Sequence, residues 1–225
     1  MATNPEFLSH TLLMSVFQVP LYQRGYSWRK QHVEELLKDI GLCDIGNAPV
    51  HHFINSFIAK KVGDLETDEA HRPVYELTDG QQRMTTLYLI LTRLYHKMEE
   101  LGAEPEELSG LERRLWVTPI AQHRVPRLTF DENSRQHFWN ELITQLNPEA
   151  TFSSEHRLID AVETIDLFLA DFPVINPTGL KEICTSICLL IIVGVRLFSV
   201  VSTNCSPKAN KSISATPIFA LLIVK

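Results

Sequence analysis

The sequence predicts a mixed α/β (α+β) domain with a helical subdomain, on three observations. Two extended segments, "HFINSFIAKKV" at 52–62 and "PVYELT" at 73–78, precede the most regular helical pattern of the chain. That pattern spans about 79–100 and is apolar nearly all round in its middle, which is typical of a helix buried in a core. Three further helices are expected, at about 104–116, 131–147 and 153–172. A chain of 225 residues can bury a core of this kind.

The N-terminal segment, residues 6–19, is expected to form a short helix or an extended lead-in. Pro20 biases Val19 away from helical geometry, so the chain should leave this segment extended. Ser27 is a candidate N-cap for the next helix. The apolar face of that helix recurs at helical spacing, at Val33, Leu36, Leu37 and Ile40.

Local signals divide the rest of the chain. "GDLETDEAHR" at 63–72 is acidic and is expected to form a mobile loop between the two strands. Gly102 is a natural stop for the long helix. Asp131 and Ser153 are candidate N-caps for later helices. "VPRLTF", at 125–130, is expected to be a short extended connector.

The C-terminal region begins with a helix expected from residue 178. It runs into "LLIIVGVRLF", whose β-branched residues predict a buried strand. The apolar run from Ile187 to Val195 is much shorter than the roughly 20 residues that a membrane-spanning helix needs. We therefore expect no contact with a membrane.

The composition limits the classes of function. All 27 acidic residues lie at or before Glu182, together with 17 of the 21 basic ones, so the first 182 residues carry a formal charge of -10 and the rest carry +4. This balance opposes strong non-specific binding to DNA, which requires clustered Lys and Arg. The four cysteines fit no standard zinc spacing, and their small number indicates reduced thiols and a cytoplasmic protein.

Two segments carry the candidate chemistry. "VPLYQRGYSW", at 19–28, places a glutamine and an arginine between aromatic residues just before a helix. "LTDGQQRMTTL", at 77–87, again places glutamine beside arginine at a helix entrance. The chain contains no HExxH, GxSxG or Walker-type glycine loop, which argues against the common metalloprotease, serine hydrolase and P-loop chemistries.

The second segment has the features of a phosphate site at a helix N-terminus. Gly80 would let a phosphate approach the unpaired main-chain N–H groups, and Arg83 can donate two hydrogen bonds to its oxygens. Gln81, Gln82, Thr85 and Thr86 add neutral donors. Asp79 is either an N-cap or a ligand for a phosphate-bound Mg²⁺. A capped helix with a polar first turn explains the same residues without a ligand.

The first segment has two interpretations of equal weight. Tyr22, Tyr26 and Trp28 could pin the chain to the following helix, with Arg24 paired to a surface carboxylate. Aromatic residues around an arginine are also what a loop that stacks bases or contacts phosphates requires.

Together the two segments carry a family resemblance. "F-x-V-P-x-Y-Q-R-x-Y-S-W" followed by "Y-E-L-T-D-G-Q-Q-R-M-T-T-L" resembles the N-terminal domain of GmrSD-type restriction endonucleases, a family related to the ParB/sulfiredoxin-like fold. The resemblance covers about residues 6–196. It implies a small mixed sheet with an inserted helical bundle, expected here at about 101–175.

The resemblance also implies a function. Members bind and hydrolyse nucleoside triphosphates in modification-dependent defence against phage DNA. The expected ligand is therefore an NTP with Mg²⁺, and the expected partners are a nuclease domain or subunit and modified DNA. The implied catalytic residues are Asp79 and Gln82, with Asp79 also as metal ligand. The implied nucleotide-binding residues are Tyr22, Gln23, Arg24, Gly80, Gln81, Arg83 and Thr85. We expect Arg24 and Arg83 to face one cavity.

The chain departs from the family pattern after Arg196. The usual "F-x-x-I-N-x-x-G-x-x-L-x-x-x-D" segment and the HNH nuclease domain are missing, so DNA cleavage by this chain alone is not expected. Residues 197–225 are hypothesised to be a frameshifted or mis-terminated end that leaves "LLIIVGVRLF" as an exposed sheet edge. A divergent genuine ending, with "TPIFALLIV" as a closing strand, is the alternative. The other functions left open are a non-catalytic module that binds modified DNA or a partner, and an inactive truncated product.

Overall fold

The computed structural model describes residues 4–42, 52–67, 69–170 and 191–199. Its strands are β1 (Asn4–Phe7), β2 (Val16–Val19), β3 (His52–Glu66), β4 (His71–Asp79), β5 (Trp116–Val117), β6 (Val125–Pro126), β7 (Leu128–Phe130) and β8 (Ile191–Ser199). Its helices are α1 (Leu8–Met14), α2 (Lys30–Leu42), α3 (Gln81–Glu100), α4 (Pro105–Leu115), α5 (Asn133–Ile143) and α6 (Ser153–Ala170). The expected α+β class is confirmed.

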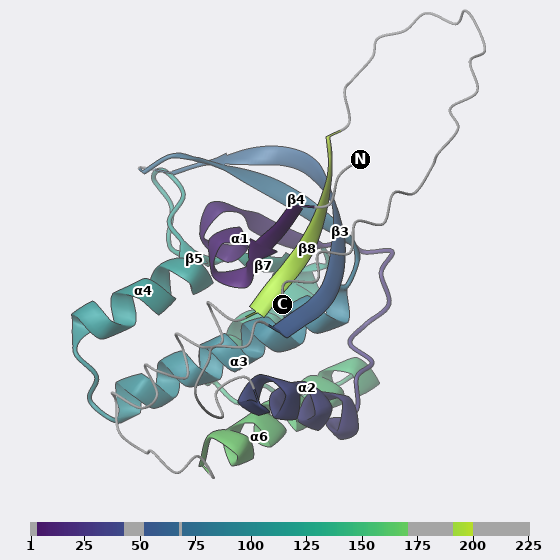
Figure 1. The fold of residues 1–225 in the computed structure, drawn as a ribbon, viewed down its shortest axis with the longest axis vertical. Coiled ribbons are helices and arrows are strands. Elements are labelled where there is room, and N and C mark those ends of the chain that lie inside the picture. Colours follow the sequence, from purple (N-terminus) through teal and green to yellow (C-terminus); the bar gives the residue numbers. More distant parts are fainter. Residues whose placement is uncertain (1–3, 43–51, 68, 171–190, 200–225) are drawn as a thin grey trace, which may run out of the picture.

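The main sheet is mixed, with the strand order β1-β8-β3-β4-β2-β7. β8 pairs antiparallel with β1 and parallel with β3, and β3 pairs antiparallel with β4. β2 pairs in parallel with both β4 and β7. Strands β5 and β6 form a separate two-stranded ribbon. In Figure 1, α2, α3 and α6 lie together below this sheet, and α4 extends to one side.

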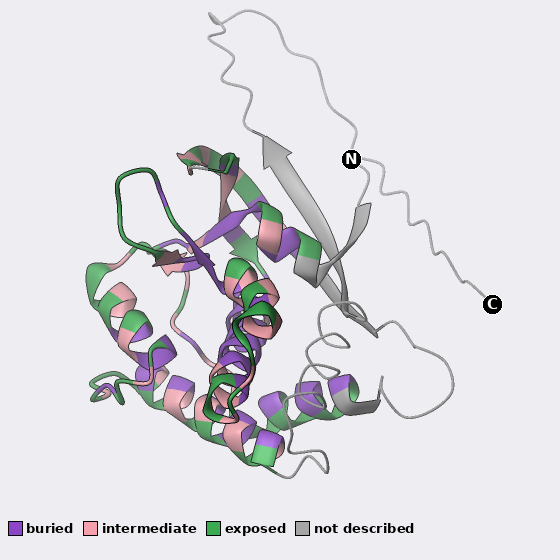
Figure 2. Cartoon of the chain, turned by 90° about the vertical axis from the view of Figure 1, so that its left-hand side faces the viewer, coloured by how far each residue is buried: buried purple, intermediate pink, exposed green. Residues whose placement is uncertain are grey.

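Helix α3 is the centre of the hydrophobic core. Its middle is buried on every face, including Tyr88 through Leu91, as its apolar composition predicts. Trp139 of α5 is also fully buried, and its Nε1 donates to the main-chain oxygen of Leu128 (2.9 Å). Figure 2 shows the buried residues gathered where the helices face the sheet and one another. The helix ends near Gly102, which has a positive φ of 75°.

The acidic segment 63–72 is not the mobile loop that we expected. β3 continues to Glu66, β4 begins at His71, and the two strands pair from Asp64↔Pro73 to Glu66↔His71. The prediction was wrong because antiparallel pairing satisfies the backbone of a charged segment as well as that of an apolar one. This long hairpin brings Thr67, Glu69 and Arg72 close to α4 and the β5–β6 ribbon.

The region expected as a helical insertion also contributes to the sheet. Its connector "VPRLTF" forms β6 and β7, and β7 is an edge strand, paired in register Phe17↔Leu128 with β2. The sheet therefore recruits a strand from between α4 and α5.

The three expected N-caps differ from those observed. Helix α2 begins at Lys30, and the Ser27 main-chain N–H donates instead to Gln82. Glu132 occupies the N-cap position of α5, and Asp131 accepts from Gln18 Nε2 (3.0 Å). Ser153 is the first helical residue of α6 rather than its cap. In each case a partner distant in sequence or a one-residue shift changed the expected boundary.

Strand β8 lies inside the sheet, between β1 and β3, so "LLIIVGVRLF" is not the exposed edge that we expected. The N-terminal strand β1 covers that side. The helix expected from residue 178 and the tail after Ser199 lie outside the described residues. Among the helices that the structure describes, none has both the length and the apolar composition required to cross a membrane.

Candidate functional site

The two motif segments meet because they follow neighbouring parallel strands. The YQR loop (residues 20–29) leaves the C-terminal end of β2, and the DGQQR turn (residues 79–83) leaves that of β4. β2 and β4 pair in parallel, so their carboxyl ends lie at the same edge of the sheet. The segments are therefore placed side by side by strand pairing, although they are far apart in sequence.

Two glutamine side chains join the segments. Gln81 Nε2 donates to Gln23 Oε1 (3.1 Å) and to the main-chain oxygen of Arg24 (3.0 Å). Gln82 Nε2 donates to the main-chain oxygen of Gly25 (3.3 Å), and its Oε1 accepts from the Ser27 N–H (2.7 Å). We call these contacts the glutamine clamp. The loop has no regular secondary structure, so its main-chain N–H and C=O groups need other hydrogen-bond partners, and the two side-chain amides provide them.

The clamp is almost closed to solvent. Gln81 is 7% exposed and Gln82 is 8% exposed. Gln23 extends the network, because its Nε2 donates to the main-chain oxygen of Thr78 (2.8 Å). The amides of Gln81 and Gln82 are thus engaged with the loop in this structure, whereas we had assigned them to a nucleotide and to catalysis.

Two tyrosines hold the loop at different depths. Tyr26 is buried, its hydroxyl lies 2.7 Å from Thr86 Oγ1, and burial raises its pKa to about 12. Tyr22 is 68% exposed and donates to Glu76 Oε1 (2.7 Å), which is the main reason that its pKa is raised. Tyr26 therefore anchors the loop to α3, Trp28 stacks on the following helix α2, and the Tyr22 side chain is largely exposed.

Gly80 is required by the backbone and by packing. It is the N-cap of α3 with φ 87° and ψ 7°, in the left-handed region. A Cβ at this position would lie 2.4 Å from Cδ1 of the buried Phe57. The glycine therefore lets the turn pass directly over an aromatic ring of β3. The approach of a phosphate at this residue stays a prediction.

The remaining predicted site residues have different surroundings. Asp79 is exposed at the end of β4. Arg83 places its guanidinium over the Phe57 ring, 5.6 Å from the ring centroid. Thr85 is 3% exposed and lies among buried residues of α3, so its hydroxyl is not on the surface of the turn.

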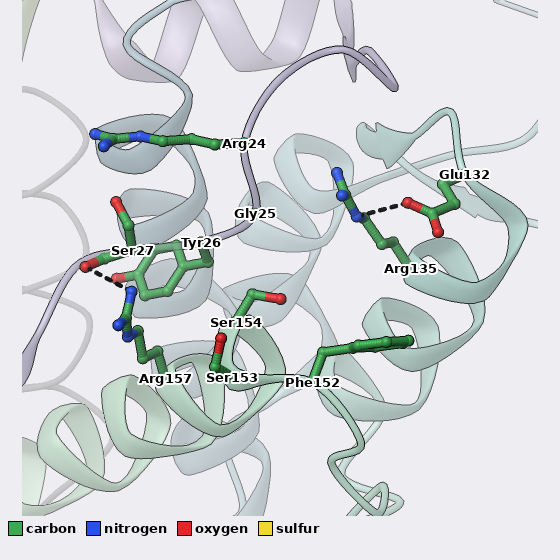
Figure 3. A pocket seen from close by; sticks show the side chains of 10 residues that line it. All are labelled: Arg24, Gly25, Tyr26, Ser27, Glu132, Arg135, Phe152, Ser153, Ser154 and Arg157. Carbon is green, nitrogen blue, oxygen red and sulfur yellow. Dashed lines mark hydrogen bonds and ion pairs between the residues drawn. The ribbon is translucent and has the colours of Figure 1, made fainter.

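A cavity of about 440 Å³ lies beside the YQR loop and contains Arg24. Its other charged residues are Arg135 of α5, Arg157 of α6 and Glu132, and the first turn of α6 adds Ser153 and Ser154 (Figure 3). Arg83 does not line this cavity, and a cavity shared by Arg24 and Arg83 stays a prediction.

Both arginines that sequence analysis missed brace the loop. Arg135 pairs with Glu132 through Nε (2.7 Å) and donates from Nη1 to the Gln23 main-chain oxygen (3.2 Å). Arg157 Nη1 donates to the Ser27 main-chain oxygen (3.5 Å), as Figure 3 shows. No local pattern marks either residue, since each lies on an ordinary amphipathic helix and reaches the loop only through the tertiary fold.

The part of the chain that the structure describes contains no group of three or more His, Cys, Asp or Glu side chains able to hold a metal ion. A single exposed carboxylate such as Asp79 fits only a metal held mainly by other ligands. Mg²⁺ bound through substrate phosphates is of this kind.

Comparison with protein families confirms the resemblance. The model of the family described as "GmrSD restriction endonuclease, N-terminal domain" matches residues 6–220. The match continues beyond Arg196, where we expected the resemblance to end. A search of curated proteins found no match. Since the family match covers nearly the whole chain, the protein belongs to the family of GmrSD restriction endonuclease N-terminal domains.

Proposed function

We propose that this domain binds a nucleoside triphosphate and regulates a modification-dependent restriction system. Family membership points to a component of a restriction system that acts in phage defence. Nucleotide binding and regulation are the further steps of the proposal.

The observation that carries the nucleotide proposal is the cavity beside the YQR loop. Three arginines and one glutamate are among its lining residues, so these residues together have a formal surplus of two positive charges. Arginine matches phosphate oxygens through paired N–H donors. Its volume of about 440 Å³ lies in the usual range for small-molecule sites, which is roughly 300–1,000 Å³.

In this proposal the DGQQR turn contacts the same ligand from the other side of the YQR loop. Arg83 is proposed to leave Phe57 and contact a phosphate, and Asp79 to complete the coordination of a phosphate-bound Mg²⁺. Gln82 is the second residue proposed for hydrolysis. It becomes available only when its hydrogen bonds to Gly25 and Ser27 open.

This requirement supports a regulatory function. The glutamine clamp joins the loop that lines the cavity to the N-terminus of the core helix α3. A ligand that draws the loop toward α6 would weaken the clamp and alter the entrance of α3. A ligand can shift such an equilibrium only by its difference in affinity for the two states.

A binding module without turnover is the second candidate function. The observation that favours it is the burial of Gln81 and Gln82, whose amides are engaged in the clamp. In that case the domain would bind a nucleotide and transmit its presence to a partner, without releasing phosphate.

One experiment tests both candidates. ATP and GTP, each with Mg²⁺, are titrated calorimetrically into the full chain, and phosphate release is followed in the same samples. Binding with release supports the regulatory NTPase, and binding without release supports the module. If the folded protein binds neither nucleotide at millimolar concentration, the proposal is wrong.

A further inference from the structure

A second cavity, of about 350 Å³, lies away from the YQR loop, between the tip of the β3–β4 hairpin, the end of α4 and the β5–β6 ribbon. None of the residues that line it belongs to the YQR loop or the DGQQR turn. Its charged residues are Arg72, Arg113, Arg124, Arg127, Glu69 and Glu112. We call it the arginine cavity. It contains four guanidinium groups and only two carboxylates.

Arg127 is the most deeply buried of these charges, at 3% exposure. Its hydrogen bonds go to main-chain oxygens, from Nε to Arg113 (2.8 Å) and from Nη1 to Ser15 (3.2 Å). Neutral carbonyls orient the guanidinium but do not cancel its charge. Burial, and then repulsion from Arg72, lower the pKa of Arg127 to about 10, so it remains charged at neutral pH.

Arg72 is also buried, at 8% exposure, and its hydrogen bonding is incomplete. Its Nε has no hydrogen-bond partner among the described residues. Nη2 shares Glu69 at 3.3 Å, and Nη1 contacts only the weak acceptor Sδ of Met14 at 3.6 Å. A buried donor without a partner costs free energy, and a buried charge without full compensation costs more.

The two carboxylates cannot balance the four cations. Glu69 Oε2 lies 3.3 Å from both Arg72 and Arg113, so one carboxylate serves two guanidinium groups. Glu112 pairs with Arg124, whose guanidinium also lies over the Trp116 ring, 4.5 Å from its centroid. The cation–π contact holds Arg124 at the cavity wall. The arginine cavity therefore has a formal surplus of two positive charges.

We propose that the arginine cavity binds the phosphate group of a small molecule, either free phosphate or the phosphate of a mononucleotide. A phosphate group carries about -1.5 to -2 charges at pH 7 and offers several acceptor oxygens, which matches the surplus charge and the excess of donors. A nucleic-acid strand is a poorer candidate because the first 182 residues carry a formal charge of -10. This inference does not depend on nucleotide binding beside the YQR loop.

The experiment measures phosphate binding by the full chain. Thermal unfolding is followed with increasing sodium phosphate and with sodium chloride at matched ionic strength, and affinities are measured by calorimetry. We expect phosphate to raise Tm progressively and chloride to have little effect, because a ligand that binds only the folded state stabilises it.

Two substitutions assign the effect to the cavity. Arg113→Gln removes an exposed cavity charge and should weaken phosphate binding at least about threefold, whereas Glu69→Gln removes a competing carboxylate and should strengthen it by a similar factor. Glu66→Gln, at an exposed carboxylate on the same hairpin but outside the cavity, is the matched control and should leave the affinity unchanged. Neither cavity variant alters a buried side chain, so both are expected to fold.

Further titrations identify the source of the phosphate. Tighter binding of a nucleoside monophosphate than of free phosphate, with the same response to Arg113→Gln, assigns the site to a nucleotide, and equal binding assigns it to free phosphate. Equal Tm shifts in phosphate and chloride overturn the proposal. Phosphate affinities that do not respond to Arg113→Gln and Glu69→Gln also overturn it. If Arg83→Ala loses NTP binding but still binds phosphate, the NTP site and the arginine cavity are two independent sites.

Discussion

Gly80→Ala is expected to destabilise the protein by about 2–5 kcal/mol, and the structure divides this cost into two parts. Gly80 has φ 87°, where a residue with a Cβ costs roughly 1–2 kcal/mol. The added Cβ would also lie 2.4 Å from the Phe57 ring, and forcing extra atoms into a packed core costs roughly 1–3 kcal/mol more.

Two other glycines separate these parts. Gly102 also has a positive φ, of 75°, but nothing lies within 4 Å of the position that a Cβ would occupy there, so Gly102→Ala should show only the backbone cost of about 1–2 kcal/mol. Gly63 has neither a positive φ nor a neighbour within 4 Å, and Gly63→Ala should be close to neutral. The free energy of unfolding of all three variants is measured by urea denaturation. If Gly80→Ala costs no more than Gly102→Ala, the close contact with Phe57 does not exist.

Three further predictions concern the two motif segments. Arg83→Ala should weaken NTP binding by about 1.5–3 kcal/mol in calorimetry, because a hydrogen bond to a charged group is lost. The Tm of the protein without ligand should change little. Gln82→Ala should lower the free energy of unfolding by about 1–3 kcal/mol and speed hydrogen exchange of the Ser27 amide, which loses its acceptor. The pKa of Tyr26 is raised from 10.0 to about 12, so its contribution to stability should be complete below pH 10 and decline as pH rises toward 12. Tyr26→Phe should therefore reduce this alkaline decline, and the part that persists should include contributions from Tyr88, Tyr95 and Tyr22, whose pKa values are also raised.

Each of these has a result that would contradict it. Unchanged NTP affinity in folded Arg83→Ala removes Arg83 from the phosphate site. Normal protection of the Ser27 amide in Gln82→Ala would mean that the hydrogen bond from Ser27 to Gln82 does not order the loop. An alkaline stability profile that is identical in wild type and Tyr26→Phe would show that the Tyr26 hydroxyl is not held protonated by its burial.

Local patterns were sufficient for most elements of the fold. The apolar pattern between Gly80 and Gly102 predicted α3 almost to the residue, because helix propagation and its termination depend on neighbouring residues along the chain. The strands at 52–62 and 73–78 were also correct, but their length was underestimated. Charged residues at 63–66 and 71–72 enter strands because pairing with the partner strand, rather than side-chain polarity, decides whether their backbone is satisfied.

The sequence alone was sufficient to recognise the family from the two motif segments, since their residue types and order are local properties of the chain. It could not determine how they meet. Parallel pairing of β2 with β4 brings the loops together, and the side-chain amides of Gln81 and Gln82 join them by hydrogen bonds. The braces Arg135 and Arg157 and the surplus charge of the arginine cavity come from residues on separate elements. Such groups become neighbours only when strand order and helix packing are set, and no spacing along the chain records those contacts.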